Sequence, residues 1–252
     1  MPLRRHPPIH PLTHPPSHPS TPSTMTNVVD DKTIVREYFN ATGFDRWRRI
    51  YGDGEVNKVQ LDIRKGHQKT VDTVMTWLQE DETLPGLSVC DAGCGVGSLS
   101  LPLAATGAKV FASDISAKMV EEAETRAQAT LSPEQVPNFQ VSDLQDLSGR
   151  YHTVICLDVL IHYPQADAAE MIAHLSSLAE SRLLLSFAPK TLCYSLLKQV
   201  GSLFPGPSKA TRAYLHAEKD VVTILESLGW TIQRRAMHKT QFYFSRLLEA
   251  TR

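Results

Sequence analysis

The chain has 252 residues, of which 42% are hydrophobic, and its formal net charge is −1 at pH 7. This length allows one full α/β domain with additions. The nearly neutral charge gives no electrostatic reason to expect a nucleic-acid partner. Because no run of about 18 apolar residues occurs, we expect no membrane-spanning helix.

Residues 1–24 are rich in proline, histidine and serine and contain few apolar side chains. Prolines at this density prevent helices and sheets, so we predict a disordered leader. Histidines recur there at every fourth position: His6, His10, His14 and His18. That spacing would align metal ligands only on a helix, which the prolines exclude. The leader also lacks the apolar core of a signal peptide.

Residues 25–80 predict an N-terminal helical arm that could act as a lid. A helix is expected at about 31–39, followed by a stretch in which aromatic residues alternate with arginines, among them Arg46, Trp47, Arg49 and Tyr51. Such side chains could cover a flat apolar acceptor and grip its carboxylates. An ordinary helix and turn packed by its aromatic residues is the alternative. A long amphipathic helix should follow, with an apolar face formed by Val59, Ile63, Val71, Val74, Met75 and Leu78.

Residues 87–98 predict a buried strand, a glycine-rich loop and the start of a helix. Asp91 precedes Gly93, Gly95 and Gly97, and glycines let the backbone turn sharply and approach a ligand closely. The spacing fits neither the dinucleotide fingerprint nor a phosphate-binding P-loop. Asp114 ends the next strand, where a carboxylate can accept hydrogen bonds from both hydroxyls of a ribose.

This unit resembles the S-adenosylmethionine site of class I methyltransferases, in which Asp91 would face the cationic amino group of the ligand. A tight turn in another α/β protein is the alternative. Asp143 ends a third strand and would suit the amino group of adenine, although it could equally cap a helix. The complete set of predicted cofactor contacts is Asp91, Gly93, Cys94, Gly95, Gly97, Asp114, Ile115, Ser142, Asp143 and Leu157.

Further strands are expected at 138–143, 151–158 and 182–188, and a final hairpin at 231–236 and 241–248. Helices are expected between them at 116–130, 166–178, near 192–200, and at 219–228. Alternation of this kind predicts an α/β fold, a doubly wound and mostly parallel sheet with an antiparallel hairpin at its C-terminal edge. We assign this methyltransferase-like domain to residues 81–252, with room for a cap insertion at about 191–216.

The four cysteines, Cys90, Cys94, Cys156 and Cys193, form no C-x-x-C pair, and no histidine lies at zinc-site spacing from them. We therefore expect no protein-bound metal, and a reducing compartment fits this cysteine usage. Cys94 lies in the glycine-rich loop, where its oxidation could block ligand binding.

The acceptor chemistry is expected just after the fourth strand, at His162 and Tyr163. Methyltransferases that act on amide or adenine nitrogen usually carry Asn/Asp-Pro-Pro-Tyr there, and this chain does not. His162 would instead lie where an acceptor meets the methyl group. The alternative is a histidine that caps the following helix.

Residues 38–54 and 56–64, together with the glycine-rich loop, resemble the cyanobacterial form of the magnesium-protoporphyrin IX O-methyltransferases of chlorophyll biosynthesis. The similarity covers about residues 25–252. It implies methyl transfer from S-adenosylmethionine to one propionate carboxylate of Mg-protoporphyrin IX, giving the monomethyl ester, with the magnesium carried by the substrate. It also implies that Tyr51 and His162 are catalytic, and we expect substrate contacts from Arg46, Trp47, Arg49 and Tyr163.

The resemblance further implies contact with the porphyrin-carrying subunit of magnesium chelatase, and a location in the cytoplasm or peripheral to the thylakoid membrane. A propionic acid resembles glutamic acid, with a pKa of about 4.3, and is already an anion at neutral pH. His162 is therefore expected to orient the carboxylate or to contact the magnesium, not to remove a proton. Two alternatives are a methyltransferase for another small acceptor, such as a quinone precursor, and a non-catalytic S-adenosylmethionine-binding partner of porphyrin enzymes.

Deleting residues 1–24 should leave thermal stability and turnover essentially unchanged, because that composition cannot build a core. The measurement compares melting temperature and methylation rate for the full chain and for a chain that starts at Met25. A large loss in either quantity would contradict the predicted disorder.

Overall fold

The computed structural model describes residues 31–52, 54–81, 83–190 and 213–252. A seven-stranded sheet forms its centre, in the order β3-β2-β1-β4-β5-β7-β6. The strands are β1 (Ser88–Ala92), β2 (Lys109–Asp114), β3 (Asn138–Val141), β4 (Tyr151–Cys156), β5 (Ala179–Phe187), β6 (Thr231–Lys239) and β7 (Phe244–Thr251). Strands β1 to β5 pair in parallel, and β7 pairs antiparallel with both β5 and β6. The predicted sheet with its antiparallel C-terminal edge is confirmed.

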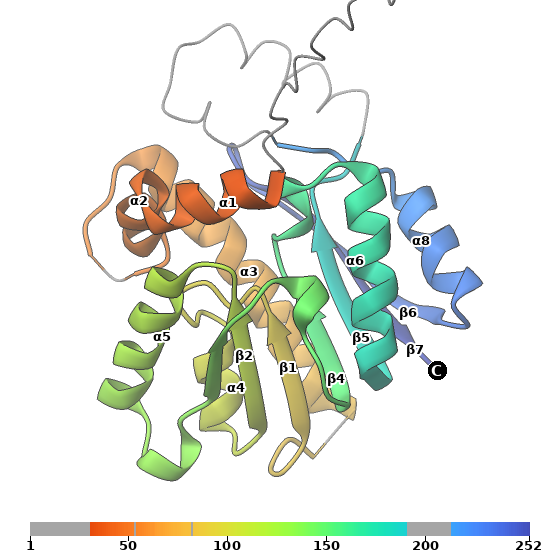
Figure 1. Ribbon diagram of the computed structural model, residues 1–252, viewed down its shortest axis with the longest axis horizontal. Helices are drawn as coiled ribbons and strands as arrows, with labels where there is room; N and C mark the ends of the chain where they lie inside the picture. The colour runs from red at the N-terminus through yellow and green to blue at the C-terminus, as the bar shows by residue number, and fades with distance from the viewer. Residues whose placement is uncertain (1–30, 53, 82, 191–212) are drawn as a thin grey trace, which may run out of the picture.

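Helices surround this sheet (Figure 1). They are α1 (Asp31–Asn40), α2 (Thr42–Ile50), α3 (Lys58–Asp81), α4 (Ser100–Ala105), α5 (Ala117–Thr130), α6 (Gln165–Leu178) and α8 (Glu218–Ser227). Short 3-10 turns lie at η1 (Pro133–Gln135), η2 (Leu144–Asp146) and η3 (Leu160–His162). The helix expected near 192–200, and most of the cap expected at about 191–216, lie outside the described residues.

Two apolar cores lie on opposite faces of the sheet, because successive side chains of a strand point to opposite sides. On β4, Val154 and Cys156 belong to one core and Ile155 to the other. The first core includes apolar residues of α6 and α8, and the second includes residues of α3 and α4. The central strands are therefore buried on both faces, as expected for a parallel sheet between two layers of helices.

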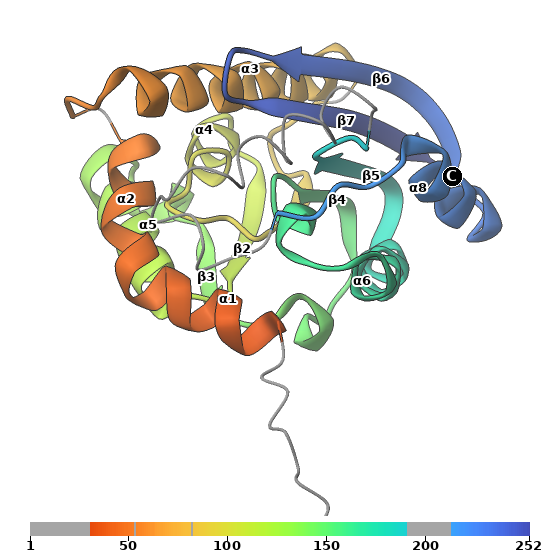
Figure 2. The same cartoon turned by 90° about the horizontal axis from the view of Figure 1, so that it is seen from above.

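Helices α1 and α2 cross one end of the parallel strands, and Figure 2 shows them from above, next to α5. The side chain of Asn40, the last residue of α1, joins the arm to α5. Its Oδ1 accepts hydrogen bonds from Ser116 Oγ at 2.9 Å and from the Lys118 backbone nitrogen at 3.3 Å. Ser116 is the N-cap of α5, as its sequence position indicates. The arm is thus attached at the helix that follows β2, and its action as a lid stays a prediction.

The long helix α3 ends before Pro85, as predicted, but its apolar face is shorter than expected. Val71, Val74 and Leu78 are buried, whereas Val59 in the first turn is 41% exposed. The reason lies in the neighbours of the first turns. Asp62 accepts a hydrogen bond from the Phe242 backbone nitrogen at 2.7 Å, so this end of α3 borders the turn between β6 and β7 and does not cover a core. Val59 was therefore wrongly assigned to the apolar face.

None of the helices in the described part of the chain is long and apolar enough to cross a membrane.

The contact between α3 and the sheet is tight at Gly66. A Cβ atom there would lie 2.4 Å from Tyr243 Cδ1. Overpacking should cost about 1–3 kcal/mol and the helix propensity of alanine should offset about 1 kcal/mol of this, so we expect Gly66→Ala to lower the free energy of unfolding by up to about 2 kcal/mol. Gly54→Ala is the matched control, because its Cβ would meet nothing within 4 Å. Equal effects of the two substitutions on denaturant unfolding would contradict this packing argument.

Candidate active site

The loop between β1 and α4 depends on three glycines in the left-handed region. Gly93, Gly95 and Gly97 have φ values of 87°, 53° and 85°. A Cβ on Gly93 would lie 2.2 Å from Val159 Cγ2, so no larger residue fits there. A Cβ on Gly95 would meet no atom within 4 Å, which leaves its backbone open to a ligand. The loop therefore has the form that close approach of a nucleoside requires.

Two carboxylates, the buried Asp91 and the half-buried Asp114, lie at this end of β1 and β2. Asp114 accepts hydrogen bonds from the backbone nitrogens of Gly95 at 3.0 Å and Ser116 at 2.9 Å, and Asp91 accepts one from Ser100 Oγ. Burial raises the pKa of each carboxyl to about 6 despite these bonds, and the charge of Asp114 adds to the rise at Asp91. A ligand that brings a positive charge and hydroxyl donors would stabilise both ionised forms. The pair therefore fits the ammonium group and ribose of S-adenosylmethionine.

The remaining predicted cofactor residues lie around this pair. The Ser142 backbone nitrogen donates to Asp114 O at 2.9 Å. Asp143 caps η2, accepting from the Gln145 nitrogen at 3.0 Å, and forms an ion pair with Lys32 at 3.6 Å. Its carboxylate thus has the capping role that was the alternative to an adenine contact. Ile115 packs against the first core, and Leu157 is buried in the second.

Cys94 is buried in the glycine-rich loop. Burial, together with the charges of Asp114 and Asp91, raises the pKa of its thiol well above the ordinary value. The thiol therefore stays protonated at neutral pH, and a protonated thiol is a poor nucleophile toward oxidants. This environment gives no support to an oxidation-sensitive role.

A row of rings connects the two predicted catalytic residues, which are distant in sequence. His162 contacts Phe39 edge to face at 5.2 Å between ring centroids. Phe39 lies 6.4 Å from Trp47, and Trp47 lies 5.4 Å from Tyr51. Helices α1 and α2 and turn η3 together provide these side chains. The structure thus brings Tyr51, Trp47 and His162 into one aromatic wall, hereafter the aromatic row.

His162 and Tyr51 are both uncharged at neutral pH. Burial lowers the pKa of His162 to about 4, even though the charge of Asp158 acts in the opposite direction. Burial and the same Asp158 charge raise the pKa of Tyr51 well above its ordinary value. The capping alternative for His162 finds no support, because the N-cap of α6 is Pro164 and no side chain caps that helix.

Two arginines bind the C-terminal end of α2, where main-chain carbonyls lack helical partners. Arg64 of α3 donates to the carbonyls of Arg49 and Ile50, both at 2.7 Å, and to that of Gly54 at 2.9 Å. Arg126 of α5 donates to the carbonyls of Tyr51 at 3.0 Å and Arg48 at 3.3 Å. We call Arg64 and Arg126 the arginine clamp. It fixes the backbone that carries Tyr51.

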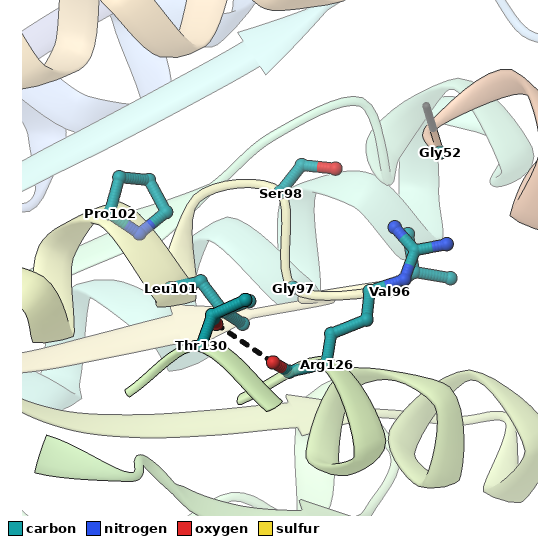
Figure 3. Close-up of a pocket in the computed structure, with 8 residues that line it drawn as sticks. All are labelled: Gly52, Val96, Gly97, Ser98, Leu101, Pro102, Arg126 and Thr130. Carbon is teal, nitrogen blue, oxygen red and sulfur yellow. Dashed lines mark hydrogen bonds between the residues drawn. The ribbon is translucent and has the colours of Figure 1, made fainter. Parts of the chain in front are cut away.

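Arg126 also lines a pocket of about 310 Å³ where the arm meets the glycine-rich loop. Figure 3 shows its guanidinium group extending from α5 toward Gly52 and the loop. The lining residues are Gly52, Val96, Gly97, Ser98, Leu101, Pro102, Arg126 and Thr130. The arm and the predicted cofactor loop therefore form walls of one cavity.

The other predicted substrate residues differ in their surroundings. Arg46 lies over the Trp47 ring at 5.7 Å, whereas Arg49 is exposed and donates to Asp45 O at 3.2 Å. Tyr163 is only 2% exposed and belongs to the first core. The side chain of Tyr163 thus packs within the first core, and its contact with the substrate stays a prediction.

A polar cluster surrounds Asp158, at positions that no local sequence motif marks. Its Oδ2 receives hydrogen bonds from His67 Nδ1 at 2.9 Å and Tyr243 OH at 2.7 Å. Its Oδ1 receives them from Ser186 Oγ at 2.8 Å and Ser245 Oγ at 3.0 Å. Burial alone would raise the pKa of Asp158, but its interactions with His67, Tyr243 and Ser186 lower it to about 2. Local patterns could not reveal the cluster, because the partners come from α3, β5 and the β7 region.

Comparison with known proteins agrees with this geometry. Residues 156–252 match the family described as magnesium-protoporphyrin IX methyltransferase C-terminus, and residues 89–181 match a methyltransferase domain. The chain is 64% identical to a magnesium-protoporphyrin O-methyltransferase of Synechocystis over 229 residues, which cover 90% of this chain and 100% of that protein. This chain belongs to the magnesium-protoporphyrin IX methyltransferase family.

Other members give the same assignment. A chloroplastic magnesium protoporphyrin IX methyltransferase of Arabidopsis thaliana is 64% identical over 221 residues, 87% of this chain and 71% of that protein. The crystal structure of the Synechocystis PCC 6803 enzyme with bound SAH superposes with a TM-score of 0.83 at 62% identity, covering 88% of this chain and 99% of that chain. Membership of the family and the fit of the carboxylate pair together identify S-adenosylmethionine as the cofactor.

Within the described ranges, no group of three or more His, Cys, Asp or Glu side chains is arranged to hold a metal ion.

Affinity for S-adenosylhomocysteine should increase as pH rises through about 6. The reason is that Asp91 and Asp114 are protonated below that pH, and a protonated carboxyl neither attracts an ammonium group nor accepts both ribose hydroxyls. Calorimetric titration between pH 5 and 8 measures this affinity.

Asp114→Asn should weaken S-adenosylhomocysteine binding by about 10- to 100-fold, corresponding to about 1.5–3 kcal/mol for bonds to a charged group. Asp72→Asn, at an exposed position of α3, is the control, and pH-independent affinity in the wild type would contradict the assignment.

Proposed function

We propose that this chain transfers the methyl group of S-adenosylmethionine to a propionate carboxylate of Mg-protoporphyrin IX, giving the monomethyl ester used in chlorophyll biosynthesis. The observation that carries the proposal is the aromatic row, which joins Tyr51 to His162 in a chain of this family. A flat macrocycle with anionic propionates requires ring faces and hydrogen-bond donors in one place, and the row combines both.

The residues proposed to hold the cofactor follow from the carboxylate pair. Asp114 would accept the ribose hydroxyls, Asp91 would balance the ammonium charge, and the open backbone at Gly95 would face the nucleoside. Bound S-adenosylmethionine supplies an electrophilic methyl group on a sulfonium centre. The task of the protein is then to hold the acceptor carboxylate in line and to exclude water from it.

The acceptor needs no deprotonation, because a propionate with a pKa of about 4.3 is ionised at neutral pH. Tyr51, as a protonated phenol, and His162, as a neutral imidazole, can each donate one hydrogen bond to that carboxylate. Orientation of this kind can supply roughly 7–11 kcal/mol of rate acceleration. Removal of water by the aromatic row would strengthen the remaining electrostatic interactions.

The arm residues proposed to bind the acceptor are Trp47, through its ring, and Arg46 and Arg49, through their charges. His162 could alternatively bind the central magnesium as an axial ligand, because a neutral imidazole is also a metal ligand. Both roles need the ring in the same neutral state, which the low pKa of His162 supports.

On the family resemblance we also propose contact with the porphyrin-carrying subunit of magnesium chelatase and peripheral association with a thylakoid membrane. Three exposed apolar side chains, Val59, Leu61 and Phe242, support a contact surface. They lie at the start of α3 and in the adjoining turn, which the bond between Asp62 and Phe242 connects. Vesicle flotation and pull-down by the purified subunit test the two associations separately.

Incubation with methyl-labelled S-adenosylmethionine and Mg-protoporphyrin IX, followed by pigment chromatography, tests the reaction. The expected result is label in the monomethyl ester, with much less label from metal-free protoporphyrin or from a quinone precursor. Labelling of the quinone precursor alone would favour a different small-molecule methyltransferase. Cofactor binding without any labelled product would favour a non-catalytic binding protein.

His162→Gln should keep more activity than His162→Ala, because glutamine preserves a hydrogen-bond donor. With a pKa of about 4, His162 titrates close to the propionate, so the position of the acidic limb alone cannot identify the group responsible. With S-adenosylmethionine saturating at every pH, we expect single-turnover rates to fall below about pH 5 in both the wild type and His162→Gln, because the limb belongs to the substrate carboxylate. Loss of the limb in His162→Gln would assign it to the histidine and contradict the orienting role.

A further inference from the structure

Asp158 has an unusual backbone conformation and lies next to a residue that contacts the glycine-rich loop. Among the described residues it is the single non-glycine residue with a positive φ, at 58°. It follows the end of β4 and precedes Val159, whose side chain packs against Gly93 of the cofactor loop. Strained residues at such places persist only where their surroundings hold them, and they occur preferentially at functional sites.

The surroundings of Asp158 are a built polar cluster and not chance contacts. Four side chains donate hydrogen bonds to its carboxylate, and its own backbone nitrogen donates to Ser186 Oγ at 2.8 Å. Tyr243, one of the four, is itself held by Thr70 at 2.9 Å. These bonds therefore fix the orientation of the Asp158 carboxylate, and they also restrain the four side chains that donate to it.

His67 links this cluster to the aromatic row. Its Nδ1 bonds to Asp158, and its ring lies 4.3 Å from the Tyr51 ring at an interplanar angle of 36°. His67 is 8% exposed, so packing restrains the ring in addition to the hydrogen bond. The arginine clamp holds the Tyr51 backbone, whereas the Tyr51 ring packs against the rings of Trp47 and His67, of which His67 is the nearer at 4.3 Å between centroids.

We propose that Asp158 is a positioning residue for the methyl transfer, with its carboxylate fixing the ring of His67 and that ring fixing the phenol of Tyr51 beside the acceptor carboxylate. The inference rests on the proposed function, since it assigns a role within that reaction. The charge of Asp158 also acts on both predicted catalytic side chains, raising the pKa of Tyr51 and opposing the fall in the pKa of His162. Asp158 is thus coupled to both ends of the aromatic row.

A double-mutant cycle between Asp158→Asn and Tyr51→Phe tests the proposal. Asparagine tolerates positive φ, so the backbone can be kept while the charge is lost. Asp158→Asn should lower kcat by about 10-fold or more, because misplaced reacting groups lose orientation, and should leave S-adenosylhomocysteine affinity within about 3-fold. Once the Tyr51 hydroxyl is absent, its placement no longer matters, so the double variant should stay within about 3-fold of Tyr51→Phe.

His67→Phe is a second variant that tests the proposal, since it keeps a ring beside Tyr51 but loses the bond to Asp158. It should reproduce the loss of kcat, and its own cycle with Tyr51→Phe decides the question if Asp158→Asn does not fold. The matched control is His174→Phe on α6, which removes an imidazole bonded to Leu147 O at 2.9 Å and should leave kcat unchanged. The proposal would be overturned if the losses of kcat in the two single variants multiplied in the double variant. It would also be overturned if Asp158→Asn and His67→Phe kept the normal kcat per folded molecule. Absence of ester formation by the wild type would instead overturn the proposed function.

Discussion

A negative charge withdrawn from water is costly unless hydrogen-bond donors surround it. The Asp158 carboxylate lies just after the central strand β4 and therefore needs such donors there. Its donors come from α3, from β5 and from the region of β7, so these segments must converge there. The antiparallel pairing of β7 with β5 sets Arg246 opposite Phe187, and the adjacent Ser245 and Ser186 both donate to Asp158 Oδ1. The C-terminal hairpin therefore does more than close the sheet, because it completes the support of the predicted acceptor side.

The arm has a corresponding support in α5. This helix begins shortly after Asp114, and it bonds to the arm at both of its ends. Asn40 accepts from its first turn, while Arg126 near its last turn binds the carbonyl of Tyr51. A change in the position of α5 on cofactor binding would thus be transmitted directly to the aromatic row. The predicted cofactor side and the predicted acceptor side therefore contact the same helix.

Local pattern was enough to predict most of the sheet and the glycine-rich loop, because strand alternation and glycine spacing are properties of neighbouring residues. The Ser116 N-cap was predicted for the same reason. Long-range packing decided what local pattern could not. Val59 continues an apolar spacing but borders a turn, and Tyr163 follows His162 but packs inside a core. Asp158 and His67 are far apart in sequence, so their pairing depends on how α3 crosses the sheet.

The arginine clamp bears on how the substrate preference of this enzyme could be changed. Arg64 and Arg126 bind main-chain carbonyls of residues 48–51 and 54, and these bonds do not depend on which side chains those residues carry. The backbone of α2 can therefore keep its attachment while side chains on its surface are exchanged. Positions 46 and 49 could therefore be varied in a combinatorial library aimed at other carboxylated tetrapyrroles. The main-chain bonds to the arginine clamp would stay the same in every member of that library.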